Sequence, residues 1–313
     1  MKTILITGGA GFIGSSLAET LLKKEKYRLV IADDLSTGDI SKLPQGFSHD
    51  VFAFYTCDVN VQEQLQWIFK KEKIDIIFHY AAMVGVKRTL ANPLGVLRDI
   101  DGLKNIFEMA VKHNVEKVFF SSSSEVYGEP VEIPQNETTT PLNSRLPYAI
   151  VKNVGEAFCR SYFQTYGLKY TIFRFFNTYG PKQSKDFVVS KFINAALKNE
   201  PITIYGDGTQ TRTFCYIDDN VDACIEIFEK GYYENDVVNI GNDKETSILE
   251  LAQKIVMLTN SNSEIRHLPP LPEGDMSRRK PDITKMRKVL NRPLIDLNEG
   301  IKRILQNPKY ILL

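Results

Sequence analysis

The sequence has almost no net charge and few cysteines and histidines, and each shortage excludes a class of function. There are 39 lysines and arginines against 38 aspartates and glutamates, so the chain lacks the basic excess of nucleic-acid-binding and membrane-surface proteins. Its four cysteines form no CxxC pair, and its four histidines show no metal-ligand spacing. We therefore expect buried, reduced thiols, no metal site, no nucleic-acid partner and a small molecule as ligand.

The sequence also lacks a long hydrophobic run. No segment approaches the ~18 apolar residues that span a bilayer, and the apolar part of MKTILITGGAG at the N-terminus is too short for a signal peptide. With 43% hydrophobic residues in a chain of 313, a large buried core is possible. These features predict a soluble, cytoplasmic protein without a membrane partner.

What the chain does have is a regular alternation of short apolar runs and amphipathic stretches. This alternation predicts strands at 2–7, 28–33, 75–81 and 115–120, and helices at 15–24, 61–71 and 101–114. The strands are apolar throughout, as a sheet buried on both faces requires. We therefore expect an α/β protein with a Rossmann-type doubly wound parallel sheet. After FRFFNTYGP the alternation loosens, which predicts a smaller C-terminal α/β lobe that binds substrate.

The spacing of apolar residues in the predicted helix at 101–114 indicates which of its residues face the core. Leu103, Ile106, Phe107, Ala110 and Val111 recur at intervals of three and four residues. This spacing places them on one face of the helix, which we expect to be buried.

A glycine-rich segment follows the first predicted strand. TGGAGFIG places Gly8, Gly11 and Gly14 between a strand and a helix, where backbone N–H groups and the helix N-terminus can hold a pyrophosphate. Asp33 ends the next strand, where a carboxylate binds ribose hydroxyls but repels a 2′-phosphate. The pattern indicates a dinucleotide site for NAD rather than NADP; ordinary glycine turns are the alternative.

Further residues are assigned to the same cofactor. Asp58 in the CDV segment is a candidate for holding the adenine, against which Val59 would pack. The full set of predicted cofactor-binding residues is Gly8, Gly11, Phe12, Ile13, Gly14, Asp33, Asp58, Val59, Ala81, Tyr148 and Lys152.

The segment PYAIVK predicts a catalytic pair. Tyr148 and Lys152 are four residues apart, so on a helix they share one face. The lysine cation would stabilise the tyrosine phenolate and lower its pKa, which makes the phenol a general base for a hydroxyl group. The YxxxK pattern is frequent by chance, and a surface pair is the alternative. The serine run SSSS, which follows a predicted strand as ligand-binding residues do in such sheets, favours the catalytic interpretation.

Seven motifs together resemble the extended short-chain dehydrogenase/reductase family, in its branch of NAD-dependent nucleotide-sugar epimerases, dehydratases and decarboxylases. They are TGGAGFIG, DDLSTG, FHYAA, SSSSEVYG, YAIVK, FRFFNTYGP and GDGTQTRTFCYIDD. The resemblance implies that Ser123 completes a catalytic triad with Tyr148 and Lys152, and that the cofactor stays bound while C4 of the sugar is oxidised.

The resemblance also implies a site for the nucleotide sugar. Asn177 and Arg212 should contact the diphosphate, Arg278 should be a second cation there, and Val188 should lie in the segment that lines the base. Two arginines on a diphosphate make strong, directional bonds. A surface ion pair is the alternative for Arg212. With Ser123, Ser124 and Glu125, these four residues complete the predicted substrate-binding set.

Glu125 leaves the reaction outcome open. By the resemblance, simple 4-epimerases carry a small residue or threonine at its position, whereas dehydratases carry an acid. Ser-Ser-Glu is similar to the Thr-Ser-Glu of UDP-glucuronate decarboxylases and GDP-mannose dehydratases. We therefore expect oxidation at C4 followed by epimerisation, decarboxylation or release of the 4-keto product, as in a 4-dehydrogenase, with 4,6-dehydration as an alternative. A structural ion pair is the other interpretation of Glu125. The family usually has asparagine where Asp99 stands, and its decarboxylases have arginine at Lys182.

Two further interpretations of the whole chain compete with the enzyme. A non-catalytic NAD sensor or scaffold on this fold is one, although Ser123, Tyr148 and Lys152 are all present. A reductase of free alcohols is the other, and the predicted diphosphate residues disfavour it.

The resemblance also predicts domains and assembly. The NAD-binding domain should comprise residues 1–177 and about 212–240, and the nucleotide-sugar lobe about 178–211 and 241–313. A homodimer should form through the helix after Ile100 and the Tyr148 helix. The alternative is that the apolar stripes of both helices face only the sheet.

Overall fold

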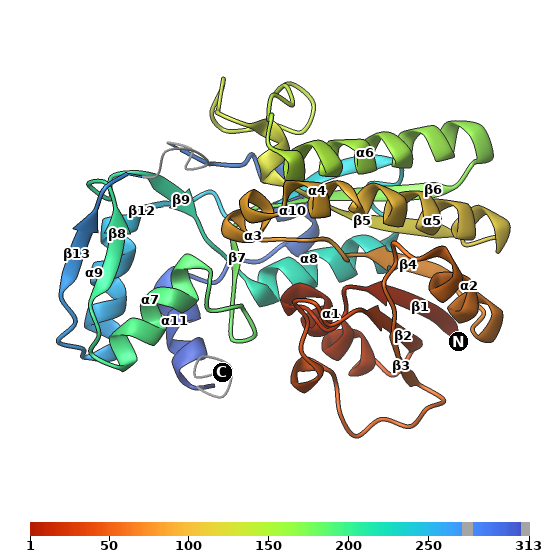
Figure 1. The fold of residues 1–313 in the computed structure, drawn as a ribbon, viewed down its shortest axis with the longest axis horizontal. Coiled ribbons are helices and arrows are strands. Elements are labelled where there is room, and N and C mark those ends of the chain that lie inside the picture. The colour runs from red at the N-terminus through yellow and green to blue at the C-terminus, as the bar shows by residue number, and fades with distance from the viewer. Residues whose placement is uncertain (271–277, 308–313) are drawn as a thin grey trace. The chain divides into compact units, whose positions relative to one another are not determined.

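The computed structural model of the chain describes residues 1–270 and 278–307, which fold into two compact units (Figure 1). The first unit comprises Met1–Val126, Ser144–Arg174 and Cys224–Val238, and the second comprises the remaining stretches. Residues 127–143 and 212–223 therefore lie in the second unit, whereas we expected them in the cofactor-binding domain. Both stretches are separated in sequence from most of the unit they join, so local sequence patterns do not reveal their membership.

A seven-stranded sheet forms the centre of the first unit, in the order β11-β6-β5-β4-β1-β2-β3. Its strands are β1 (Lys2–Thr7), β2 (Tyr27–Asp33), β3 (Phe52–Thr56), β4 (Ile76–His79), β5 (Lys117–Ser123), β6 (Lys169–Phe175) and β11 (Asp236–Ile240). The ladders that join β3, β2, β1, β4 and β5 are parallel, with Leu5 between Val30 and Ile77. The predicted Rossmann-type sheet is confirmed, and its strand order reverses between β1 and β4, where ligands bind in such folds.

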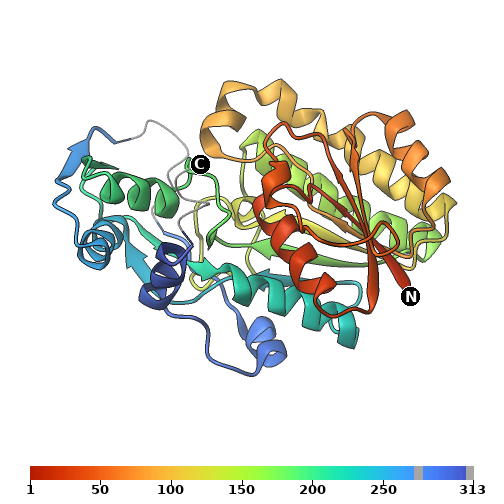
Figure 2. The same ribbon diagram turned by 90° about the horizontal axis from the view of Figure 1, so that it is seen from below.

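Helices cover both faces of this sheet (Figures 1 and 2). On one face lie α4 (Pro93–Leu97), α5 (Asp99–Lys112) and α6 (Pro147–Tyr166), with α2 (Gln62–Lys71) beside α5; on the other lie α1 (Phe12–Leu22) and α8 (Ile217–Lys230). Four residues of the predicted stripe of α5 are buried, since Leu103, Ile106, Phe107 and Ala110 are at most 2% exposed. The fifth, Val111, is half-buried and packs against the core. Burial on both faces explains why the strands are apolar throughout.

The second unit is also α/β and contains short paired strands. Parallel pairs join β8 (Ile202–Tyr205) to β13 (Ile265–Leu268) and β7 (Thr178–Tyr179) to β10 (Cys215–Tyr216), while β9 (Thr211–Thr213) and β12 (Glu245–Ser247) are antiparallel. Its helices are α7 (Val188–Leu197), α9 (Ile248–Thr259), α10 (Thr284–Leu290) and α11 (Leu297–Leu305). Helix α9 packs on α7 and α11 to form the core of this unit.

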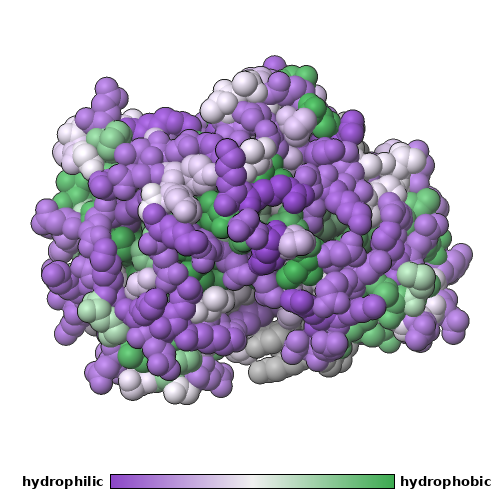
Figure 3. Space-filling model, turned by 180° about the vertical axis from the view of Figure 1, so that it is seen from behind, coloured by the Kyte–Doolittle hydropathy of each residue, from purple (hydrophilic) through white to green (hydrophobic). Residues whose placement is uncertain are grey.

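The surface and the thiols agree with the composition. Hydrophobic side chains on the face shown in Figure 3 form scattered patches among hydrophilic ones. Cys57, Cys159, Cys215 and Cys224 are all buried free thiols, as predicted. Within residues 1–270 and 278–307, every helix is too short or too polar to cross a bilayer.

Candidate functional site

The glycine-rich loop lies where β1 meets α1 in the first unit. Gly8 has a φ of +67°, and a Cβ there would lie 2.7 Å from the backbone nitrogen of Ala81. A Cβ on Gly14 would lie 2.5 Å from the Gly8 carbonyl oxygen. The turn between strand and helix is therefore too close-packed for side chains at these positions, as a loop that brings backbone N–H groups onto a pyrophosphate requires.

Asp33 holds this loop at the end of β2. Its two carboxylate oxygens accept the backbone N–H groups of Ala10 and Leu35, both at 2.9 Å. Burial raises the pKa of Asp33, while these two hydrogen bonds lower it. A carboxylate has about four acceptor positions, so two remain for ribose hydroxyls. The predicted position at a strand end fits NAD.

The predicted adenine residues lie after β3. Val59 is 7% exposed, and its carbonyl accepts the Asn105 side-chain amide at 2.9 Å. Asp58 is 3.6 Å from Arg98 in an ion pair and accepts the backbone N–H of Asn60. The assignment of Asp58 and Val59 to the adenine remains a prediction. Phe12 and Ile13 form the first turn of α1, as the strand-to-helix pattern predicted.

Tyr148 and Lys152 lie one turn apart at the start of α6, and the Lys152 Nζ is 5.7 Å from the centroid of the Tyr148 ring. Pro147 provides the first residue of this helix, where its fixed φ and missing N–H cost nothing. Lys152 is 3% exposed, and burial lowers its pKa to about 8, opposed by the charge of Asp99. The Lys152 cation is therefore placed to lower the pKa of the Tyr148 phenol, since a cation beside a phenol favours its ionised form.

The three serines at the end of β5 have separate partners. Ser121 accepts from Lys152 Nζ at its carbonyl (2.7 Å) and at its hydroxyl (3.3 Å), and its hydroxyl donates to the His79 carbonyl. Ser122 donates to the Glu156 carboxylate at 2.7 Å. The hydroxyl of Ser123 accepts the backbone N–H of Glu125 at 3.2 Å. Lys152 therefore bonds β5 two residues before Ser123, which is the last residue of the strand.

Glu125 lies directly beyond Ser123, in the short 3₁₀ helix η2 (Ser124–Tyr127). The strand end thus presents a hydroxyl and a carboxylate two residues apart, both in the first unit with Tyr148 and Lys152. Ser124 between them is 2% exposed. The predicted catalytic residues lie on β5, η2 and α6, and Lys152 bonds Ser121, two residues before Ser123. Their roles remain predictions.

Asp99 adds a second charge beside Lys152. It is the first residue of α5, and its carboxylate accepts the Met83 backbone N–H at 2.8 Å. Burial raises the pKa of Asp99, while the Met83 bond and the Lys152 charge lower it. The interaction is mutual, because Asp99 in turn favours the charged form of Lys152.

His79 at the end of β4 is a buried neutral group that the motif analysis did not single out. Its Nδ1 lies 2.8 Å from the Thr7 hydroxyl, which also accepts the N–H groups of Tyr80 and Ala81. Burial, with help from the Lys152 charge, lowers the pKa of His79 to about 3. The imidazole is thus neutral and fixes the turn that packs on Gly8.

In the second unit, Asn177 and Arg212 lie on neighbouring segments. The Asn177 side-chain amide donates to the Thr213 carbonyl at 3.2 Å, and the backbone carbonyl of Asn177 accepts the Cys215 N–H. Arg212 is 8% exposed and lies on β9. Val188 is the first residue of α7. The diphosphate and base contacts predicted for these residues remain predictions.

Arg278 lies next to this segment through a parallel bridge between the backbones of Thr211 and Arg278. Its guanidinium forms a two-pronged ion pair with Glu245, at 2.5 and 2.7 Å. The backbone of Arg278 therefore lies beside Thr211, the residue before Arg212. The Arg278 side chain, however, is bound to the Glu245 carboxylate.

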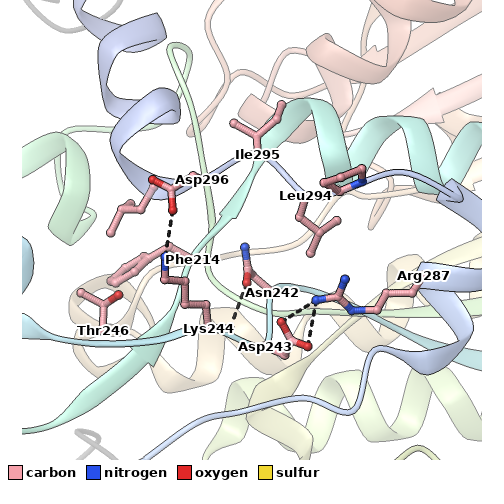
Figure 4. Close-up of a pocket in the computed structure, with 11 residues that line it drawn as sticks. Phe214, Asn242, Asp243, Lys244, Thr246, Arg287, Leu294, Ile295 and Asp296 are labelled. Carbon is pink, nitrogen blue, oxygen red and sulfur yellow. Dashed lines mark hydrogen bonds and ion pairs between the residues drawn. The ribbon is translucent and has the colours of Figure 1, made fainter.

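A cavity of about 250 Å³ lies elsewhere in the second unit (Figure 4). Residues of four segments line it, including Phe214, Asn242, Arg287 and Leu294. The cations at its edge are paired, Lys244 with Asp296 and Arg287 with Asp243. The predicted site residues are not among those that line it.

Comparisons with known proteins agree with these features. The sequence profile of the NAD dependent epimerase/dehydratase family matches residues 4–241. A UDP-N-acetyl-alpha-D-glucosaminuronate decarboxylase from Bacillus cytotoxicus is 37% identical over 323 aligned residues, which cover 97% of each chain. A putative UDP-glucose 4-epimerase from Methanocaldococcus jannaschii is 36% identical over 307 residues, covering 96% of each chain.

A solved structure extends the similarity to the whole fold. The UDP-glucose 4-epimerase from Thermotoga maritima with UDP-glucose superimposes with a TM-score of 0.91 at 32% identity, over 99% of this chain and 100% of that one. The resemblance inferred from the motifs is confirmed. The chain therefore belongs to the NAD-dependent epimerase/dehydratase family, and its cofactor is NAD.

Proposed function

We propose that this chain uses NAD to oxidise C4 of a sugar carried on uridine diphosphate. The observation that carries the proposal is the arrangement of Tyr148, Lys152 and Ser123 at the end of β5 and the start of α6, behind a complete dinucleotide loop. The three relatives described above support the UDP-sugar substrate, since each is named for one.

In this proposal each protein group has one task. Tyr148 removes the proton of the C4 hydroxyl, helped by the Lys152 cation. Ser123 hydrogen-bonds the same sugar oxygen and orients it. NAD held by the glycine loop and Asp33 would supply the hydride acceptor for C4. The buried Asp99 keeps Lys152 charged although burial lowers the lysine pKa to about 8.

The outcome then depends on the sugar. Without a carboxylate at C5, return of the hydride to the other face of C4 would give the epimer. Release of the 4-keto sugar would instead require an external acceptor that reoxidises the reduced cofactor. A C5 carboxylate becomes a β-keto acid once C4 is oxidised, and such acids lose carbon dioxide readily. Glu125, next to Ser123, favours decarboxylation as the second candidate because it supplies an acid–base group for C5.

Mass spectrometry of the products separates these outcomes. The purified holoenzyme is incubated with UDP-glucose, UDP-N-acetylglucosamine and UDP-glucuronate. An unchanged mass with a new sugar epimer indicates epimerisation, loss of carbon dioxide indicates decarboxylation, loss of two hydrogens indicates net oxidation, and loss of water indicates dehydration. No change with any nucleotide sugar contradicts the proposal and favours an NAD-binding scaffold.

The Tyr148→Phe variant tests the assigned base. It keeps the ring and removes the phenol, so turnover should fall by about 10²-fold or more. Tyr162→Phe is the matched control, because Tyr162 lies on the same helix but stacks on Phe158. Equal turnover in the two variants would reject Tyr148 as the base.

The family resemblance also leads us to propose a homodimer through α6. The side chains of Ile150, Phe163 and Tyr166 on this helix are 40% or more exposed. Part of the apolar surface of α6 is therefore not buried within the chain. In sedimentation experiments the wild type should be a dimer and the Ile150→Glu variant a monomer. A wild-type monomer would contradict the assembly.

A further inference from the structure

The first unit contains a buried charged cluster one turn beyond the catalytic lysine. Glu156 on α6 is 0% exposed and Arg174 on β6 is 1% exposed. Glu156 follows Lys152 by four residues, as Lys152 follows Tyr148, so the three share one face of the helix.

The Glu156 carboxylate is fully occupied. Its Oε1 accepts the Ser122 hydroxyl at 2.7 Å and Arg174 Nε at 2.8 Å. Its Oε2 accepts Arg174 Nη2 at 2.8 Å and Arg160 Nη2 at 3.0 Å. Four donors from three elements therefore hold this carboxylate in one orientation, and Ser122 belongs to the strand that ends in Ser123.

Three successive residues of β5 each contact α6, at Gly155, Lys152 and Glu156. The Phe120 ring lies so close to Gly155 that a Cβ there would be well inside van der Waals contact. Ser121 is bound by Lys152 and Ser122 by Glu156. The distance between the end of the strand and the start of the helix is therefore fixed at three consecutive positions directly before Ser123.

Stability alone does not explain such a cluster. Hydrophobic residues of similar volume stabilise a core as well as a buried ion pair does, because removing charges from water is costly. The fixed directions of charge-assisted hydrogen bonds give what apolar contacts do not, namely a defined position for each partner.

We propose that Glu156, held by Arg174, is a positioning residue that fixes Ser122 and so sets the position of Ser123 relative to Tyr148. The inference rests on the proposed function in one respect, that Ser123 and Tyr148 act on the same sugar oxygen. Small displacements of reacting groups can cost about 10²-fold in rate.

The test uses Ser122→Ala in the full-length holoenzyme. Replacing Glu156 would leave the Arg174 charge unpaired in the core, whereas Ser122→Ala removes one donor and keeps the other three. Thr171→Val is the matched control, because Thr171 is equally buried in β6 and its hydroxyl bonds only the Tyr233 carbonyl, at 2.9 Å. Product formation, KM and the melting temperature are measured for both variants.

We expect kcat of Ser122→Ala to fall about tenfold or more with KM nearly unchanged, as for an interaction that matters mainly in the transition state. Thr171→Val should lose a similar amount of stability and keep its kcat. Equal kcat in the two variants, at equal melting temperatures, would overturn the inference.

Ser123→Ala separates this inference from the proposed function. If Ser123→Ala keeps full activity, the catalytic assignment fails and the positioning role fails with it. If Ser123→Ala is inactive while Ser122→Ala matches Thr171→Val, only the positioning role fails.

Discussion

Each unit of the molecule contains a two-pronged arginine–carboxylate pair, and the two pairs differ in burial. In the first unit the side chains of Arg174 and Glu156 are 2% and 0% exposed. In the second unit those of Arg278 and Glu245 are 50% and 19% exposed. The bond geometry is alike, with donor–acceptor distances of 2.5–2.8 Å.

The difference in burial predicts a difference in use. A buried pair cannot exchange its partner without leaving a charge in the core, so it suits a fixed framework. An exposed pair is worth little to stability and can exchange its carboxylate for another anion. We therefore expect Arg174 to keep Glu156 throughout turnover, and Arg278 to leave Glu245 for the substrate diphosphate.

The largest expected effect comes from breaking the buried pair. Arg174→Met removes two of the four donors to the buried Glu156 carboxylate and leaves Ser122 and Arg160. It should lower the free energy of unfolding by about 3 kcal/mol, measured by urea denaturation. Arg278→Met should leave the urea midpoint almost unchanged. The double variant Glu156→Leu/Arg174→Leu should recover most of the stability. Similar midpoints for the two single variants would remove the distinction between the pairs.

Removing the exposed cation should affect binding instead. Arg278→Ala should weaken UDP-sugar binding about tenfold, since a charge-assisted bond to phosphate is lost. Isothermal titration calorimetry measures the affinity. Arg266→Ala is the control, because Arg266 forms an exposed pair with Glu264 in the same unit. If both variants bind like the wild type, Arg278 does not contact the diphosphate.

Lowering the pH should reduce the free energy of unfolding through the buried pair more than through the exposed pair, but this effect should be smaller than those of the substitutions above. Burial alone would raise the pKa of Glu156, but Arg174, Ser122 and Arg160 lower it below the usual value. A carboxylate with a lowered folded-state pKa stabilises the protein above the unfolded pKa of about 4.3, and this stability is lost as pH falls through the folded pKa. The Glu156→Leu/Arg174→Leu variant should therefore lose less stability on acidification.

Urea midpoints between pH ~6 and ~3 measure this effect. The pKa of Glu245 is also lowered, chiefly by Arg278, but solvent screens that pair. Glu245→Gln should therefore follow the wild-type acid profile closely. A wild-type profile for the double leucine variant would show that Glu156 contributes nothing to acid stability.

The smallest expected effect is a gain in affinity for the UDP-sugar. If Arg278 binds the diphosphate, Glu245→Gln removes the carboxylate that would compete for it, so UDP-sugar affinity should rise about threefold. Calorimetry at low and high salt checks this, because screening should reduce the advantage. Weaker binding by the variant would mean that Glu245 orients Arg278 rather than competing for it.

Local motifs predicted which elements carry the candidate residues of the first unit. The glycine loop, Asp33 and the Tyr148–Lys152 pair each depend on residues close in sequence, so their spacing was enough to place them on the right elements. The sheet and the α5 core stripe were predicted for the same reason.

The partners of the serines could not be predicted in this way. Ser122 meets Glu156 across 34 residues and Ser121 meets Lys152 across 31, and nothing local to SSSS indicates which hydroxyl faces which helix. The one available signal was the spacing of Tyr148, Lys152 and Glu156. The second unit was harder, because its strands are two to four residues long and pair between distant segments.

Gly155 has a practical consequence for finding such sites in other chains. The YxxxK pattern alone is too short to distinguish a catalytic helix from chance. In this chain the same helix face continues with a glycine that admits the Phe120 ring and a glutamate that binds the preceding strand. The longer pattern YxxxKxxGE, preceded by a strand that ends in Phe-Ser-Ser-Ser, describes a helix docked on its strand. It can therefore serve as a search pattern for this whole geometry rather than for two reactive side chains.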